Sequence, residues 1–155
     1  MEDRILAFDV GEARVGLAVS GVMDIMAEPL EVVAWKGNWA SLVERIKHWT
    51  GVYAANRFLL GLPRNMDGTE GAQARYVRSF AKRLRKYFPE SEIVFWDERL
   101  SSRMSERLMS EAGVYGKKRR RRVDKVSAAV ILQAYMDFQK HHATKTEDSK
   151  ENPLP

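Results

Sequence analysis

The stretch that most constrains this chain is residues 5–20, ILAFDVGEARVGLAVS, in which an apolar run ends on one acidic residue. Ile5 to Phe8 are apolar, Asp9 and a turn containing Gly11 follow, and the chain then returns with alternating apolar and small residues. This pattern predicts a strand, a tight turn and a second, antiparallel strand. An ionised carboxylate in a buried strand is costly unless it is paired or binds a metal, so Asp9 requires an explanation.

Two explanations of Asp9 remain open from this stretch. An aspartate often stabilises a bend, because its side chain accepts hydrogen bonds from the backbone amides of the turn. Alternatively, Asp9 is the central ligand of a divalent cation, or a carboxylate beside a phosphate site, at the mouth of a sheet. Gly11 and Gly16 would leave room for a ligand to approach the backbone. The sequence Asp9-Val10-Gly11 alone is compatible with both explanations.

Length and patterning predict one folded domain. A chain of 155 residues is long enough to bury a real core. We place the domain at residues 1–140 and predict a disordered polar tail over residues 141–155. The N-terminus is acidic, and no eighteen apolar residues follow one another. We therefore expect a soluble, cytoplasmic protein that makes no use of a membrane.

Composition limits the kind of metal site that the chain can form. It has no cysteine, which excludes disulfides and thiolate ligands. Its three histidines, one at position 48 and two in the polar tail, are poorly placed to bind a metal together. Any metal would then be held by oxygen ligands, which favours Mg²⁺ or Mn²⁺ over zinc.

Positive charge is concentrated in one short segment. The net charge is +5, but six cations form an unbroken run, and without this run the net charge would be −1. The run consists of Lys117, Lys118, Arg119, Arg120, Arg121 and Arg122. It is either a solvated loop or a clamp for a nucleic-acid backbone. A second group, Arg75, Arg78, Lys82 and Arg85, forms a stripe on a predicted helix and is either a solvated face or an extension of that surface.

The remaining sequence alternates between strand and helix patterns. We predict strands at 30–35, 57–61 and 92–96, and helices at 39–51, 72–88, from Ser101 or Ser102 to 113, and 124–139. The expected fold is α/β, with a five-stranded mixed sheet flanked by helices. An antiparallel meander of three strands would be joined by two parallel strands, the first of them beside the initial strand.

This arrangement can bring acidic residues together from three distant stretches. Asp9 ends the first strand, Asp97 and Glu98 follow the fifth, and Asp124 begins the last helix. Asp124 has a simpler explanation, because an acid in the first turn favours the helix dipole. Three converging carboxylates, however, are what hard divalent cations require, and two such ions can catalyse phosphodiester hydrolysis.

Four sequence blocks together resemble a known family. LAFDVGEARVGLAVS, GLPRNMDGTEGAQA, WDERLSS and RVDKVSAAVIL, in this order, are similar to the YqgF (RuvX) family, within the superfamily of RuvC-type Holliday-junction resolvases with a ribonuclease-H-like fold. The resemblance covers residues 4–138. It implies a bacterial cytoplasmic nuclease that matures the 5′ end of pre-16S ribosomal RNA. A resolvase-like role on branched DNA is the alternative that the resemblance offers.

The resemblance also implies the site residues. Asp9, Glu98 and Asp124 carry over as catalytic residues and as ligands of two Mg²⁺ or Mn²⁺ ions. Resolvases often have a second acid where this chain has Ser127, so the second ion would be held weakly. Arg14 stands where the family commonly has a lysine, and it would contact a phosphate of the nucleic acid.

Several choices stay open at this point. Asp97 is an alternative ligand to Glu98, since adjacent residues on an extended backbone point to opposite sides. Asp67 either joins the rim of the site or only forms a turn. A catalytically weak nucleic-acid-binding assembly factor is a rival function, and an actin-like phosphotransferase is disfavoured because that group needs two such domains. The sequence decides neither between pre-rRNA and branched DNA nor the oligomeric state.

Overall fold

The first strand of the chain lies at the centre of the sheet, between an antiparallel and a parallel neighbour. The computed structural model describes residues 4–21, 26–100 and 127–141. In chain order its elements are β1 (Arg4–Val10), β2 (Val15–Ser20), β3 (Ala27–Val33), α1 (Trp39–Tyr53), β4 (Ala55–Leu62), α2 (Ala72–Tyr87), β5 (Glu92–Asp97), the short 3-10 helix η2 (Glu98–Leu100) and a helix over residues 127–141, which we call the C-terminal helix.

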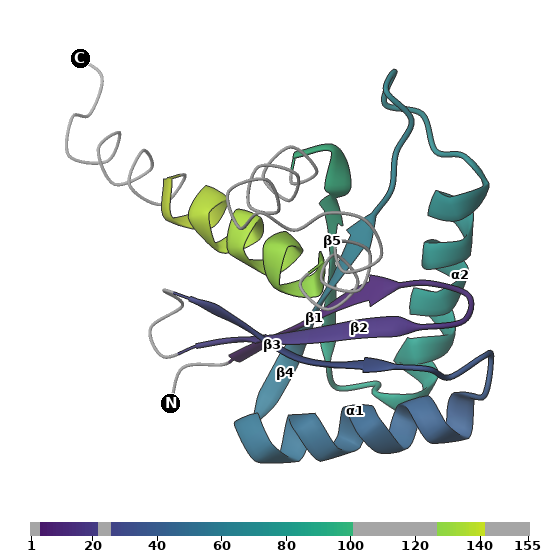
Figure 1. Ribbon diagram of the computed structural model, residues 1–155, viewed down its shortest axis with the longest axis vertical. Coiled ribbons are helices and arrows are strands. Elements are labelled where there is room, and N and C mark those ends of the chain that lie inside the picture. Colours follow the sequence, from purple (N-terminus) through teal and green to yellow (C-terminus); the bar gives the residue numbers. More distant parts are fainter. Residues whose placement is uncertain (1–3, 22–25, 101–126, 142–155) are drawn as a thin grey trace, which may run out of the picture.

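The strands of this described part form one sheet of order β3-β2-β1-β4-β5. β1 pairs antiparallel with β2 and parallel with β4, and β5 pairs parallel with β4. The predicted meander and the two parallel strands are therefore confirmed. Because β4 and β5 run parallel to β1, the carboxyl ends of all three strands meet at one edge of the sheet (Figure 1).

The third strand differs from its prediction. It covers Ala27–Val33, whereas the apolar pattern had indicated residues 30–35. Pro29 lies inside the strand, which is tolerated because β3 is at the edge of the sheet and its pairing with β2 shifts register nearby, between Leu17 and Ala18. Trp35 lies beyond the strand, where its buried ring packs edge-on against Trp39 and Phe80.

Each face of the sheet carries its own apolar cluster. One face packs against α1 and α2, and the other packs against the C-terminal helix (Figure 1). The first cluster includes Leu6, Phe8, Phe58, Leu60, Phe80 and Leu84, and the second includes Ile5, Ala7, Leu59, Trp96, Ile131 and Leu132. Since side chains alternate between faces along a strand, Asp9 belongs to the face of the C-terminal helix.

Several predicted features lie outside the described residues. They are the helix beginning at Ser101 or Ser102, the cationic run Lys117 to Arg122, Asp124 and the predicted tail beyond residue 141. Within the described ranges, no helix is both long and apolar enough to span a membrane.

One buried hydroxyl completes the pairing of the first two strands. Ser20 is fully buried at the end of β2, and its Oγ accepts a hydrogen bond of 2.8 Å from the backbone N–H of Ile5. A buried N–H that loses its acceptor costs about 1–3 kcal/mol. The Ser20 hydroxyl is therefore part of the structure of the central strand.

Replacement of Ser20 by alanine should destabilise the protein by about 1–3 kcal/mol, because the Ile5 N–H is left without its acceptor. Urea denaturation measures this change. Ser79→Ala, at an exposed position of α2, is the matched control and should change the free energy of unfolding by less than about 0.5 kcal/mol. Equal effects of the two replacements would show that the Ser20 bond contributes nothing.

Candidate functional site

Asp9 lies near the end of β1, directly before the hairpin that leads into β2. It is partly buried and pairs across the strands with Gly16. The turn after it is closed by a backbone hydrogen bond of 2.9 Å from Gly11 N to Arg14 O. A Cβ at Gly11 would lie only 2.8 Å from the same oxygen. The turn itself therefore requires glycine at position 11.

Glu98 occupies the space above a glycine of the neighbouring strand. Phe8 and Leu60 are paired between β1 and β4, so Asp9 and Gly61 are the next residues on the two strands. A Cβ at Gly61 would lie closer than 3.0 Å to Glu98 Oε1 and 2.8 Å from Ile131 Cδ1. The missing side chain of Gly61 is what allows the Glu98 carboxylate to fold back across β4.

Burial and the charge of Asp9 both act on Glu98. Loss of solvent, then the negative charge of Asp9, and then that of Asp97 raise the pKa of Glu98 from 4.5 to about 7. The effect of Asp9 on this pKa places the Asp9 charge within electrostatic range of the Glu98 carboxylate. The structure thus brings together two of the three predicted acids.

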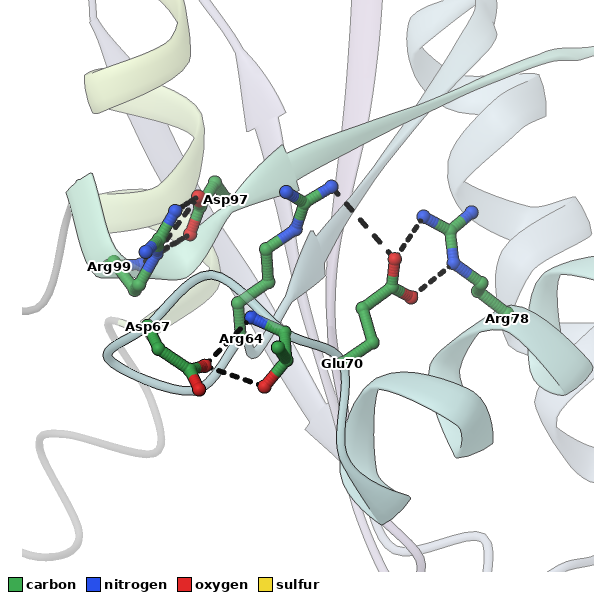
Figure 2. A network of polar contacts seen from close by, with 7 residues as sticks. Arg64, Asp67, Glu70, Arg78, Asp97 and Arg99 are labelled. Carbon is green, nitrogen blue, oxygen red and sulfur yellow. Dashed lines mark hydrogen bonds and ion pairs between the residues drawn. The ribbon is translucent and has the colours of Figure 1, made fainter.

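Asp97 is held in a different way from Glu98. By strand alternation it belongs to the face of α2, and its carboxylate accepts hydrogen bonds from Arg99, with Nη2 to Oδ2 at 2.7 Å and Nε to Oδ1 at 3.1 Å (Figure 2). These bonds lower the pKa of Asp97. The geometry therefore favours Glu98 over Asp97 as the partner of Asp9.

Arg99 also joins β5 to the loop between β4 and α2. Its Nη1 donates to the backbone oxygen of Met66, at 3.3 Å, and lies near Gly68, whose φ of +89° suits glycine. Inside the loop, Asp67 Oδ1 accepts hydrogen bonds from Thr69 N at 2.9 Å and from Thr69 Oγ1 at 2.6 Å. Asp67 is therefore a turn-forming residue in this structure, which is one of its two predicted roles.

The end of the loop is held to α2 by an ion pair. Glu70 accepts two hydrogen bonds from Arg78, at 2.5 and 2.9 Å, and lies 4.0 Å from Arg64 Nη2 (Figure 2). The Arg78 guanidinium also lies over the ring of Phe95, 4.9 Å from its centre. Arg75 Nη1 also donates a hydrogen bond of 3.4 Å to the backbone oxygen of Glu70, so two members of the predicted cationic stripe are engaged within the protein.

Arg14 and Asp9 line the same open pocket. It measures about 300 Å³ and is lined by Asp9, Val10, Gly11, Ala13, Arg14, Gly16 and Val32. Arg14 is exposed at the end of the hairpin. Arg14, which the sequence predicts to contact a phosphate, therefore lies beside Asp9.

The third acid and the cationic run cannot be placed in this geometry, because Asp124 and Lys117 to Arg122 lie outside the described residues. Among the described residues, no three histidine, cysteine or acidic side chains form a group able to hold a metal ion. Sequence reasoning missed the roles of Gly61 and Arg99. Their only signals were a glycine that closes an apolar run and an arginine that follows two acids.

A family profile described as "RuvX: Holliday junction resolvase" matches residues 3–138 of the chain. Three similar proteins carry the name "Putative pre-16S rRNA nuclease". The one from Acetivibrio thermocellus is 34% identical over 86% of this chain and 95% of its own length. Those from Pelotomaculum thermopropionicum and Bacillus mycoides are 37% and 39% identical, over 88% and 86% of this chain and 88% and 98% of theirs.

Two solved structures share the fold at low sequence identity. RuvC of T. thermophilus in complex with a Holliday junction substrate has a TM-score of 0.59 and 14% identity, over 91% of this chain and 97% of that one. The Holliday junction resolvase of fowlpox virus has a TM-score of 0.50 and 13% identity, over 86% and 98%. The predicted fold class is confirmed by these likenesses.

Replacement of Gly61 by alanine should separate the two carboxylates, because the new methyl group takes the place of Glu98 Oε1. We expect the pKa of Glu98 to fall from about 7 toward 4.5, as followed by carboxyl ¹³C NMR during a pH titration. Gly51→Ala, where an added Cβ meets nothing within 4 Å, is the control. It should leave that pKa unchanged and stabilise α1 by about 0.5–1 kcal/mol. An unaltered Glu98 pKa in Gly61→Ala would contradict the packing argument.

The raised pKa of Glu98 also predicts how stability depends on pH. The folded protein holds an extra proton between about pH 4.5 and pH 7, so this group lowers stability as the pH rises through that window. Glu98→Gln should remove that fall and raise the free energy of unfolding at pH 8 by about 1–3 kcal/mol, since water still reaches part of the side chain. Urea denaturation at pH 5 and pH 8 provides the measurement.

The exposed residue Glu44 of α1 supplies the matched variant for this comparison. Glu44→Gln should keep the pH dependence of the parent protein. If Glu98→Gln keeps it as well, the dependence comes from another group.

Proposed function

The chain belongs to the RuvX family, and on this basis we propose that it is a metal-dependent endonuclease that hydrolyses phosphodiester bonds in the 5′-end processing of pre-16S ribosomal RNA. The observation that carries the proposal is the half-buried Glu98 carboxylate above Gly61, whose pKa is raised by burial and by the negative charge of nearby Asp9. We infer the substrate, pre-16S rRNA, from the names of the similar proteins. We assign the activity to the cytoplasm, where the precursor RNA is made.

The donor set fits a hard divalent cation. Two neighbouring carboxylates that repel each other become favourable when a cation lies between them, and oxygen donors suit Mg²⁺ or Mn²⁺. Asp9 and Glu98 would hold this ion. When bound, such an ion lowers the pKa of water and stabilises charge that develops on phosphate oxygens. The half-buried position of Glu98 limits competing water, and the hairpin beside Asp9 orients the nucleic-acid strand.

We include Asp124 as a third ligand and catalytic residue. In the sequence it stands seven residues before Ile131, whose side chain lies against the position above Gly61. A second ion would be held weakly, because Ser127 stands where resolvases often have another acid. Phosphate oxygens of the substrate would then complete its ligands.

Phosphate binding is assigned to two cationic groups. Arg14 lines the pocket beside Asp9, and its guanidinium suits a phosphate but cannot act as a base. The run Lys117 to Arg122 directly precedes Asp124 in the sequence, so a strand held by it would be led toward the acids. Contacts of this kind position a backbone without reading its sequence.

A Holliday-junction-resolvase-like activity on branched DNA is the second candidate. It is favoured by the description of the family profile and by the fold shared with RuvC. A catalytically weak assembly factor is the third, and Ser127 in place of an acid is the observation in its favour. Cleavage rates on the two nucleic acids, measured side by side, distinguish all three.

Asp9→Asn should keep the fold and lower metal-dependent cleavage by more than about 100-fold, because residues that only support metal ligands already contribute 10 to 100-fold. The assay compares a pre-16S leader RNA with a four-way DNA junction, each with Mg²⁺ and with Mn²⁺. Asp137→Asn, on the exposed side of the C-terminal helix, is the control and should cleave like the parent. Parental cleavage by Asp9→Asn would make Asp9 a structural residue.

A further inference from the structure

The pocket beside Asp9 lies on the opposite side of this residue from Glu98. Glu98 reaches Asp9 across Gly61 of β4, whereas the pocket extends from Asp9 over Gly16 of β2. A strand of nucleic acid cleaved at the acids would continue across one of these two sides. The side of Glu98 is filled by its own carboxylate and by Ile131, so among the described residues the pocket is the open direction.

Three residues in register form the floor of the pocket. Asp9 pairs with Gly16, and Gly16 pairs with Val32, so the floor crosses β1, β2 and β3. Strands are roughly 4.8 Å apart, so this row extends for roughly 10 Å. A volume of about 300 Å³ is at the lower end for small-molecule sites. These dimensions suit one nucleotide and not a base pair.

The wall of the pocket is held in place by the chain that follows β3. Trp35 Nε1 donates a hydrogen bond of 3.1 Å to Gly11 O, and Lys36 N donates one of 3.1 Å to Ala13 O. Both acceptors belong to the hairpin between β1 and β2. Because Trp35 is itself buried in the core, the hairpin is anchored to the core. The pocket is therefore formed before any ligand arrives.

The lining has one cation and a small apolar surface. Arg14 supplies the positive charge, and Ala13, Gly16 and Val32 supply a surface without polar side-chain atoms. Among the described residues of the lining, Arg14 and Asp9 have the only side chains of a kind that reads base edges, and the proposed function assigns these two to phosphate and to the metal ion. Such a surface fits a phosphate beside a sugar, and with Arg14 on the phosphate and Asp9 on the metal ion it leaves no other described side chain that would select a base.

We propose that this pocket binds the nucleotide adjacent to the cleaved phosphodiester, with a phosphate against Arg14 and the sugar over Gly16 and Val32, independently of the base. The assignment of an adjacent bond rests on the proposed nuclease function. Binding of the nucleotide itself does not, and this allows the two to be tested apart.

The full-length ¹⁵N-labelled protein can be titrated with the 5′-monophosphates of adenosine, uridine, deoxyadenosine and deoxythymidine in Mg²⁺ buffer, and with inorganic phosphate. The indole N–H of Trp35, assigned through Trp35→Phe, reports on the pocket because it bonds to Gly11. We expect a saturable shift of this signal with all four nucleotides, at affinities within about threefold of one another. Inorganic phosphate should bind at least tenfold more weakly.

Val32→Glu places a negative charge on the floor and should weaken nucleotide binding at least tenfold. Val52→Glu is the matched control, because Val52 is 56% exposed on α1, and it should bind like the parent. The proposal is overturned by the absence of a shift, by equal binding of inorganic phosphate, by affinities that differ tenfold between bases, or by unchanged binding in Val32→Glu. The ribose and deoxyribose arms show whether the sugar is distinguished.

The two proposals can fail separately. Cleavage by the parent protein with no nucleotide-dependent shift would remove the pocket inference and leave the nuclease standing. A saturable shift in a protein that cleaves neither RNA nor DNA would support nucleotide binding in the pocket and contradict the nuclease function.

Discussion

The repulsion between Asp9 and Glu98 is the constraint around which the sheet edge is built. Asp9 of β1 and Glu98, which directly follows β5, lie near each other where water only partly reaches Glu98, and the pKa of Glu98 rises to about 7 as a result. The surrounding structure keeps them together. Gly61 leaves the space that Glu98 fills, and Ile131 closes it from above. Folding therefore carries an electrostatic cost that a bound cation would relieve.

Asp97, the neighbour of Glu98 in the chain, is held by a different partner from the Asp9–Glu98 pair. Asp97 and Glu98 are adjacent in the chain, yet only Glu98 turns toward Asp9, while Asp97 is paired with Arg99. The same arginine holds the backbone of Met66, so the loop after β4 is fixed to the strand end that carries Glu98. The orientation of the Asp97 carboxylate and the position of the loop between β4 and α2 thus both depend on the guanidinium of Arg99.

The sequence predicted the sheet and two of its acids because strand patterns and their ends are local properties. It left Asp97 and Glu98 as alternatives, because the sequence does not tell which of two adjacent side chains points to which face of the sheet. That is decided by packing against the rest of the core. Gly61 went unnoticed because its role comes from a lateral neighbour, which depends on register between β1 and β4. The start of β3 was misplaced because Pro29 usually marks a break, and an edge strand tolerates it.

The aromatic core and the acidic residues lie on opposite faces of the sheet. Phe8, Phe58 and Phe80 meet edge to face on the side of α1 and α2, with ring centres 5.2 and 6.4 Å from that of Phe8. Glu98 and Ile131 lie across the sheet from them. A truncation of Phe58 or Phe80 would therefore lower stability through the packing of α1 and α2, on the face of the sheet that lies away from Glu98.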